Sequence, residues 1–122
     1  MSFDLAVMNV PKSITSAEAS VLYAELCEGN VDVLSPSADI DSFYQELIST
    51  YPDIDSYSDD DVDDCPWSVE LDVSDGAVLM CMVWSRVEEV APFVMNLAAK
   101  HHLACFDPQE DKISLPPSFP VN

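Results

Sequence analysis

The residues most able to do chemistry in this sequence form an aspartate-rich segment. Residues 53–64 read DIDSYSDDDVDD and hold seven aspartates and no basic residue. Counting a twelve-residue calcium loop from Asp59 places Asp61 and Asp63 at positions three and five and Glu70 at position twelve, as in an EF-hand. The segment is therefore a candidate for a calcium site, for a solvated acidic loop, or for a surface that meets a basic protein.

Several features of the segment do not suit a calcium loop. The sixth position, which an EF-hand fills with glycine, is Asp64, and the eighth is Pro66. Glu70 falls in a predicted strand, whereas an EF-hand takes its last ligand from a helix. We therefore predict no dedicated metal site and no cofactor, and at most weak, adventitious cation binding.

A second candidate is the pair His101-His102 followed by Cys105. Zinc sites use four ligands in a closed geometry, and no CxxC or HxxxH spacing accompanies these three residues. Protonated histidines at the end of a predicted helix are favoured by its dipole, which explains them without a metal. Nucleophilic attack by Cys105 would need an activating base and an oxyanion site, and only two glycines are present to shape one. We predict no catalytic residue and no enzymatic activity.

Two tryptophans, Trp67 and Trp84, mark the ends of a predicted hairpin and are expected to lie near each other. Packing in the core or at the sheet edge is the default interpretation. The alternative is an exposed aromatic anchor beside the acidic segment, because tryptophan is common at binding hot spots. Residues 53–67 would then form one recognition surface. The predicted partner-binding residues are Asp55, Asp59, Asp60, Asp61, Asp63, Asp64, Trp67, Glu70 and Asp72.

The overall charge indicates which partners suit the chain. Its 122 residues include 23 acidic and 4 basic side chains, for a formal net charge of −19. Hydrophobic residues nevertheless make up 48% of the chain, enough for a folded core. Nucleic acids and anionic lipids would be repelled, so the predicted partner is a basic protein. The sequence leaves the oligomeric state open.

The cellular location is predicted from what the chain contains. No basic-plus-apolar leader is visible at its start, and no apolar run approaches the ~20 residues of a membrane span. The four cysteines show no secreted disulfide framework, so reduced thiols are expected. We predict a cytoplasmic protein that does not associate with membranes.

The elements that must position these residues are organised around an apolar run. Residues 77–84, AVLMCMVW, predict a central strand that is covered on both faces. Residues 67–74 alternate in polarity and predict a neighbouring strand, and Asp75-Gly76 predicts a tight turn with positive φ between the two. Further strands are predicted over residues 2–10, 103–106 and 112–115.

Helices are expected in three places. Thr15 and Glu18 form a capping-box pattern that begins the first helix, and Gly29 follows its end. The second begins at Ser37 and stops before Pro52. The third is predicted from a Ser85 cap to about His101, with Pro92 inside it.

The order of these elements, βααββαββ, predicts a single α+β domain over residues 1–122. The expected architecture is a ferredoxin-like sandwich, with a mainly antiparallel sheet and helices on one face. By analogy with that fold, the first strand lies beside residues 77–84 and the final hairpin forms one edge. An acidic loop over residues 53–66 and a proline-rich tail over residues 116–122 lie outside the regular elements.

Three segments carry a resemblance to known proteins. They are the opening SFDLAV, the stretch VWSRVEEVAPFVMNLAAKHHLACFDPQ from Val83 to Gln109, and the acidic middle. Together they resemble small, acidic, largely uncharacterised bacterial proteins that share the pattern (Y/F)DLAV…WS…A..H.L.C(Y/F)DPQ. No catalytic residue carries over.

The resemblance carries an expectation about function. Such proteins are similar in kind to the immunity proteins that neutralise toxins. The resemblance therefore implies an immunity-type inhibitor of a basic toxin or nuclease. A regulatory domain that binds a small ligand is the alternative expectation.

Overall fold

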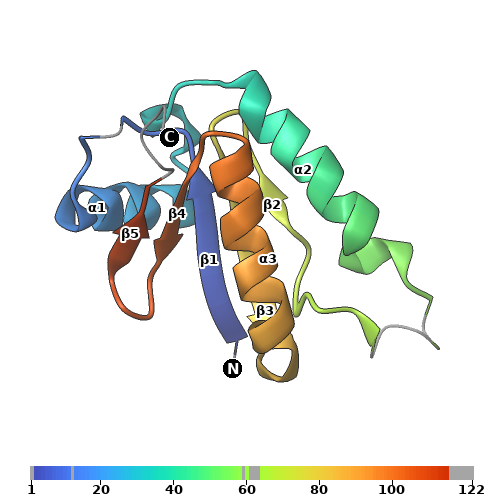
Figure 1. Ribbon diagram of the computed structural model, residues 1–122. Helices are drawn as coiled ribbons and strands as arrows, with labels where there is room; N and C mark the ends of the chain where they lie inside the picture. The colour runs from blue at the N-terminus through green and yellow to red at the C-terminus, as the bar shows by residue number, and fades with distance from the viewer. Residues whose placement is uncertain (1, 12, 59, 61–63, 116–122) are drawn as a thin grey trace, which may run out of the picture.

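The computed structural model describes residues 2–11, 13–58, 60 and 64–115, and it consists of a five-stranded antiparallel sheet with three α-helices (Figure 1). The strands follow the order β2-β3-β1-β4-β5 across the sheet. The α+β class is confirmed, as are the position of β1 beside β3 and the final hairpin at one edge. The strands are β1 (Ser2–Met8), β2 (Asp72–Val73), β3 (Ala77–Val83), β4 (Ala104–Asp107) and β5 (Lys112–Ser114), and the helices are α1 (Ser16–Cys27), α2 (Ala38–Thr50) and α3 (Val87–Lys100).

Strand β1 lies at the centre of the sheet, and the prediction that residues 77–84 form the central strand is wrong, because β3 lies between β1 and the edge strand β2. Strand β1 pairs with β3 over its whole length and with β4 on its other side, both antiparallel. Leu5, Ala6, Val7 and Met8 are all fully buried. Because side chains alternate along a strand, both faces of the sheet need a covering layer here.

Helices provide that layer on both faces, which the sequence-based prediction of a one-face sandwich did not anticipate. Leu5 and Val7 belong to a core with residues of α2 and α3, whereas Ala6 and Met8 pack with residues of α1. Figure 1 shows α3 across one face of β1, with α1 set apart behind β4 and β5. The ring of Tyr23 in α1 lies 5.4 Å from that of Phe106 in β4. The ferredoxin-like sandwich is therefore not confirmed.

The predicted start of α1 is confirmed in its hydrogen bonds. The Glu18 amide donates to Thr15 Oγ1 at 3.1 Å, and the Thr15 amide donates to Glu18 Oε1 at 2.9 Å. This reciprocal pair satisfies two N–H groups that the helix leaves free. Gly29, beyond the other end, has a φ of +88°.

Within the described residues, no helix has the length and apolar character that a membrane span requires.

The start of α3 differs from the prediction. Trp84–Arg86 form a 3-10 turn, the helix begins at Val87, and its N-cap Arg86 makes no side-chain capping bond. The rings of Trp84 and Phe3 pack edge-on, with their centroids 5.4 Å apart. The strand β3 therefore ends at Val83, one residue earlier than predicted. Ser85 is therefore not the helix cap.

The strand predicted over residues 67–74 is shorter in the structure. Only Asp72–Val73 form β2, and Trp67 makes a single bridge to Met82. The two-residue turn that follows is confirmed, because the Ser74 amide donates to the Ala77 carbonyl at 2.9 Å. Between the bridge and β2, the Leu71 amide donates to a side chain, Asp53, instead of to a strand.

Gly76 is required in this turn by a close approach and not by its backbone angle. A Cβ at Gly76 would lie 2.7 Å from Leu34 Cβ and 2.8 Å from the Ser35 carbonyl oxygen. The expected positive φ is absent, since the described residues with positive φ are Gly29, His102 and Asp111. The Asn9 amide donates to the Gly76 carbonyl at 2.9 Å, and Asn9 Nδ2 donates to the Ser35 carbonyl at 3.0 Å. The turn is thus packed against the segment that leads into α2.

Candidate protein interface

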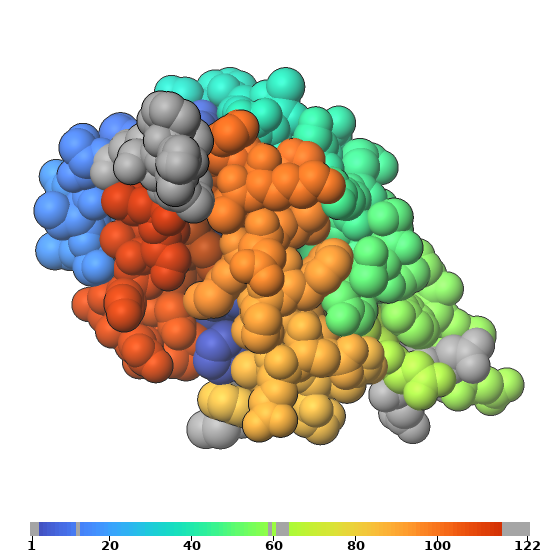
Figure 2. Space-filling model, viewed as in Figure 1, coloured from blue at the N-terminus to red at the C-terminus, as the bar shows by residue number. Residues whose placement is uncertain are grey.

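The described part of the predicted partner surface lies along the β2 side of the sheet and in the segment before it. We call this surface the acidic edge, and in Figure 2 its segment over residues 53–58 projects from one side of the molecule. Asp59, Asp61 and Asp63 lie outside the described residues. The acidic edge comprises the exposed residues Asp55, Asp60, Asp64, Glu70 and Asp72.

Asp53 links the start of the acidic segment to the residues just before β2. Its Oδ1 accepts hydrogen bonds from the Ile54 amide at 2.7 Å and the Leu71 amide at 3.2 Å, and Tyr44 Oη donates to its Oδ2 at 3.5 Å. The residue is 8% exposed. Nothing in the sequence pattern singles out Asp53 from the other aspartates, although an aspartate is a usual residue at the start of a helical turn. Its contacts hold Glu70 and the beginning of the acidic segment on the same side of the molecule.

Several carboxylates act on the hydroxyl group of Tyr44. Burial raises the pKa of the Tyr44 hydroxyl first, and the charges of Asp53, Asp55 and Glu70 raise it further. Negative charge nearby disfavours the ionised phenolate. Asp53, Asp55 and Glu70 therefore act together on Tyr44, so these three carboxylates lie on the same side of the molecule.

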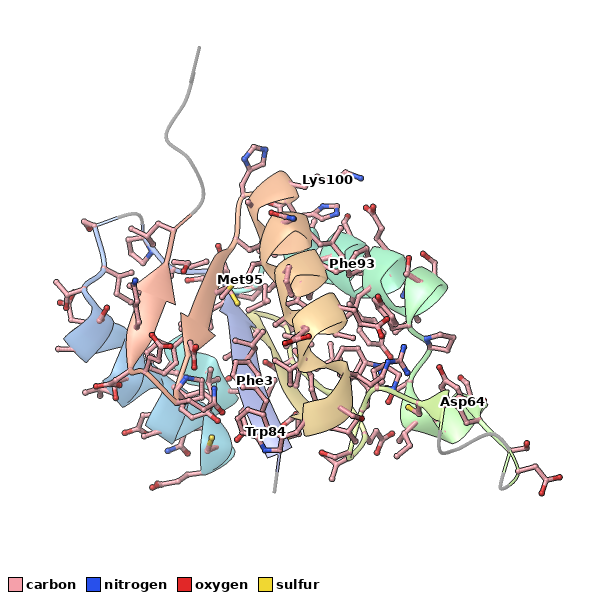
Figure 3. The ribbon with its side chains drawn as sticks, turned by 60° about the horizontal axis from the view of Figure 1, so that its bottom comes forward. Phe3, Asp64, Trp84, Phe93, Met95 and Lys100 are labelled. Carbon is pink, nitrogen blue, oxygen red and sulfur yellow. The ribbon has the colours of Figure 1, made fainter. Side chains whose placement is uncertain are left out.

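Trp67 cannot form the exposed anchor that the sequence allowed. It is 1% exposed, and its Nε1 donates to the Tyr51 carbonyl at 3.1 Å. Its assignment as a partner-binding residue is therefore wrong, and Trp67 packs in the core, as the default interpretation expected. Trp84 is 49% exposed and contacts Phe3 (Figure 3). The buried Trp67 instead packs in the core against the ring of Tyr51.

The described basic side chains form their ion pairs away from the carboxylates of the acidic edge. Arg86 donates to both carboxylate oxygens of Glu89, at 2.7 and 3.0 Å, and to the main-chain carbonyl of Asp64 at 2.7 Å. These bonds from Arg86 lower the pKa of Glu89. Lys100 pairs with Glu46 at 2.7 Å, and Lys112 belongs to β5, at the opposite side of the sheet. Over the part of the chain that the structure describes, no acidic-edge carboxylate has an ion-pair partner.

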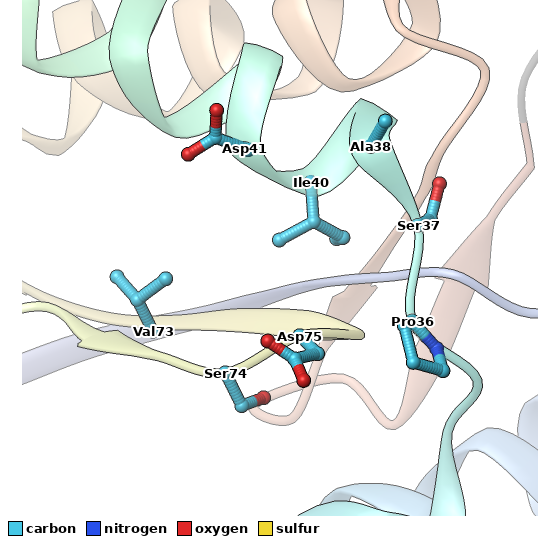
Figure 4. Close-up of a pocket in the computed structure, with 8 residues that line it drawn as sticks. All are labelled: Pro36, Ser37, Ala38, Ile40, Asp41, Val73, Ser74 and Asp75. Atoms are coloured by element: carbon cyan, nitrogen blue, oxygen red, sulfur yellow. The ribbon is translucent and has the colours of Figure 1, made fainter.

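A cavity of about 340 Å³ lies beside the acidic edge, between β2 and the first turn of α2 (Figure 4). Two carboxylates, Asp41 from α2 and Asp75 from the β2–β3 turn, stand on opposite sides of it. Val73 contributes an apolar wall and is 42% exposed. The lining residues are Pro36, Ser37, Ala38, Ile40, Asp41, Val73, Ser74 and Asp75. This lining suits a side chain with an apolar stem and a cationic end.

A second hollow, of about 450 Å³, lies on the other face of the sheet. It is formed by α1 and the segment before it, and Val21 in its wall is 63% exposed. Glu18, its charged residue, is engaged in the capping box. None of the predicted partner-binding residues lines this hollow.

The residues considered for metal binding and catalysis lie in other surroundings. Within the described ranges, no three His, Cys, Asp or Glu side chains are grouped to hold a metal. His101 Nε2 lies 3.0 Å from Glu46 Oε1. Cys105 is 2% exposed, and burial raises its pKa to about 12, so its thiol is protonated at neutral pH. The structure therefore brings His101 to a carboxylate and Cys105 into the core.

Comparison with known proteins adds no family to this description. No family model, curated protein or solved structure matches the chain. Fold class alone does not supply a function, because one fold serves many functions.

Proposed function

We propose that this protein is a non-enzymatic binding protein whose acidic edge holds a basic protein partner. The observation that carries the proposal is the group of exposed carboxylates at Asp55, Asp60, Glu70 and Asp72, none with a described ion-pair partner. Such a surface attracts an oppositely charged protein and raises the rate of association. Asp53 stabilises this arrangement in advance, so the carboxylates need little reorganisation when the partner binds.

The partner class that fits best is a basic toxin, in particular a nuclease, with this protein acting as its immunity-type inhibitor. Proteins that bind nucleic acid carry basic surfaces that contact phosphates. An acidic protein can cover such a surface in place of the nucleic acid. The resemblance of the SFDLAV and HHLACFDPQ segments to acidic bacterial proteins supports the same class.

The proposal is tested by capture and then by reconstitution. We expect the wild-type protein, immobilised and exposed to lysate of the source organism at low ionic strength, to retain a basic protein. An edge variant that lacks four carboxylates should not retain it, whereas a control variant with the same charge change elsewhere should. The edge variant carries Asp55→Asn, Asp60→Asn, Glu70→Gln and Asp72→Asn, and the control carries Glu28→Gln, Asp32→Asn, Glu110→Gln and Asp111→Asn.

The captured protein is then purified and its association rate with the wild type is measured at increasing NaCl. We expect the rate to fall by about tenfold or more between low and high salt, because steering by charge is screened. Loss of the partner's toxic or nuclease activity in the complex would identify the inhibitor role. An acidic partner, or equal binding by the edge and control variants, would contradict the proposal.

A further inference from the structure

The backbone of β2 leaves one residue open for pairing with another chain. The Ser74 amide donates to Ala77 across the hairpin, so the N–H of Ser74 points toward β3. Backbone groups alternate in direction along a strand of an antiparallel pair. The N–H and C=O of Val73 therefore point away from β3, to the free side of the sheet.

The open position is bounded on both sides by contacts within the protein. At Leu71, the next outward N–H is held by Asp53 Oδ1 at 3.2 Å. At Asp75, the carbonyl accepts a hydrogen bond from the Ser37 amide at 3.1 Å. Such closures protect an edge strand from unrestricted pairing. A partner strand is thus directed to Val73.

The side chain of Val73 connects this position to the cavity. Val73 lies opposite Val78, so both side chains are on the face of the sheet that α2 and α3 cover. A partner residue paired with Val73 would place its own side chain on that face. There it would meet the cavity, where Asp41 and Asp75 have no ion-pair partner within the described ranges.

We propose that an extended segment of the basic partner pairs with β2 at Val73 and places an arginine or lysine side chain between Asp41 and Asp75. This inference rests on the proposed function and names the position that selects the partner. Two carboxylates on opposite sides of the cavity favour a cationic side chain between them. A second copy of this chain would bind at β2 less tightly than a basic partner, because two chains that each carry a formal net charge of −19 repel one another.

The probe is a pair of synthetic nonapeptides of alternating threonine and valine with one central residue, arginine in one and its neutral isostere citrulline in the other. Binding is followed by amide resonances in NMR spectra. We expect the arginine peptide to shift the Val73 amide and protect it from hydrogen exchange. The Leu71 amide, already bonded to Asp53, should change much less. The arginine peptide should bind about tenfold more tightly, as charge-assisted bonds to carboxylates imply.

Two kinds of variant separate the backbone and charge contributions. Asp41→Asn with Asp75→Asn should remove most of the preference for arginine over citrulline. Val73→Pro removes an N–H that makes no bond to β3 and replaces the valine side chain at the cavity wall, and proline is tolerated at an edge strand. This variant should weaken the binding of both peptides to the same extent. The control, Glu28→Gln with Glu110→Gln, makes the same charge change away from the cavity and should keep the tenfold preference.

Several outcomes would overturn the inference. They are an unchanged Val73 amide at the highest soluble peptide concentration, an arginine preference that survives Asp41→Asn with Asp75→Asn, and free arginine amide that binds as tightly as the peptide. Unfolding curves for every variant exclude loss of the fold as the cause. If these cavity variants also bind the captured partner normally while the edge variant does not, this inference fails and the proposed function stands.

Discussion

At the scale of single residues, Asp53 contributes most to the shape of the acidic edge. It accepts hydrogen bonds from two backbone amides that are 17 positions apart in the chain, at Ile54 and Leu71, and a third bond from Tyr44. The other described aspartates of the segment, Asp55, Asp60 and Asp64, are exposed. One aspartate of the run is therefore structural, and its neighbours are available to a partner.

Replacing Asp53 by alanine is expected to destabilise the protein. Leu71 is buried, and its amide would lose its hydrogen-bond acceptor. We expect this loss to lower the free energy of unfolding by about 1–3 kcal/mol. Urea unfolding followed by circular dichroism measures the change. Asp55→Ala, at an exposed position in the same segment, is the control and should stay within about 0.5 kcal/mol of wild type. Equal stability of the two variants would contradict a structural role for Asp53.

Residue patterns were informative wherever the interaction is local. The Thr15–Glu18 capping box was predicted because its two bonds join residues three apart. The same spacing at Ser85 and Glu88 predicted a cap that is absent, because Trp84 packs on Phe3 and the chain turns before the helix begins. The local sequence pattern at residues 85–88 cannot predict the contact between Trp84 and Phe3, because Phe3 lies far away in the sequence.

At the scale of elements, the hairpin of β2 and β3 joins the acidic edge to α2. Its turn packs against the Leu34-Ser35 segment, and the Asp75 carbonyl accepts from the Ser37 amide at the start of α2. The cavity forms between these same elements. The position of α2 relative to β2 therefore depends on how closely the turn can approach.

Gly76→Ala is expected to loosen that approach. An added Cβ would meet Leu34 Cβ at 2.7 Å and the Ser35 carbonyl oxygen at 2.8 Å, and a backbone atom cannot move aside alone. Overpacking of this kind costs about 1–3 kcal/mol. Chemical unfolding gives the change in stability, and amide shifts at Leu34 and Ser35 report its location. Asp75→Ala, in the same turn but exposed, serves as the control, and a Gly76→Ala variant as stable as this control would refute the account.

At the scale of the whole molecule, charge is the dominant property. A formal net charge of −19 on 122 residues repels itself, while the described residues form two ion pairs with Lys or Arg, Arg86–Glu89 and Lys100–Glu46. Self-repulsion of this kind opposes the compact state. The stability of the protein should therefore depend on screening more than on its ion pairs.

Adding NaCl is expected to raise the melting temperature. Screening becomes effective over about 10 Å at 0.1 M salt, which weakens repulsion between the exposed carboxylates. A gain of about 1 kcal/mol corresponds to a rise of roughly 4 °C in Tm for a domain of this size. Differential scanning calorimetry across a NaCl series measures it. A Tm that falls with salt would show that the ion pairs of Arg86 and Lys100 matter more than the repulsion.

The sequence by itself determined the order βααββαββ, the apolar strand within residues 77–84, the α1 cap and the excess of negative charge. Each follows from composition, from periodicity or from contacts a few residues apart. Only the tertiary structure decided that α1 covers the second face, that Trp67 is buried against Tyr51, and that β2 is short. The Trp67 and Asp53 bonds span 16 and 18 residues, and such contacts depend on how the elements pack and not on local pattern.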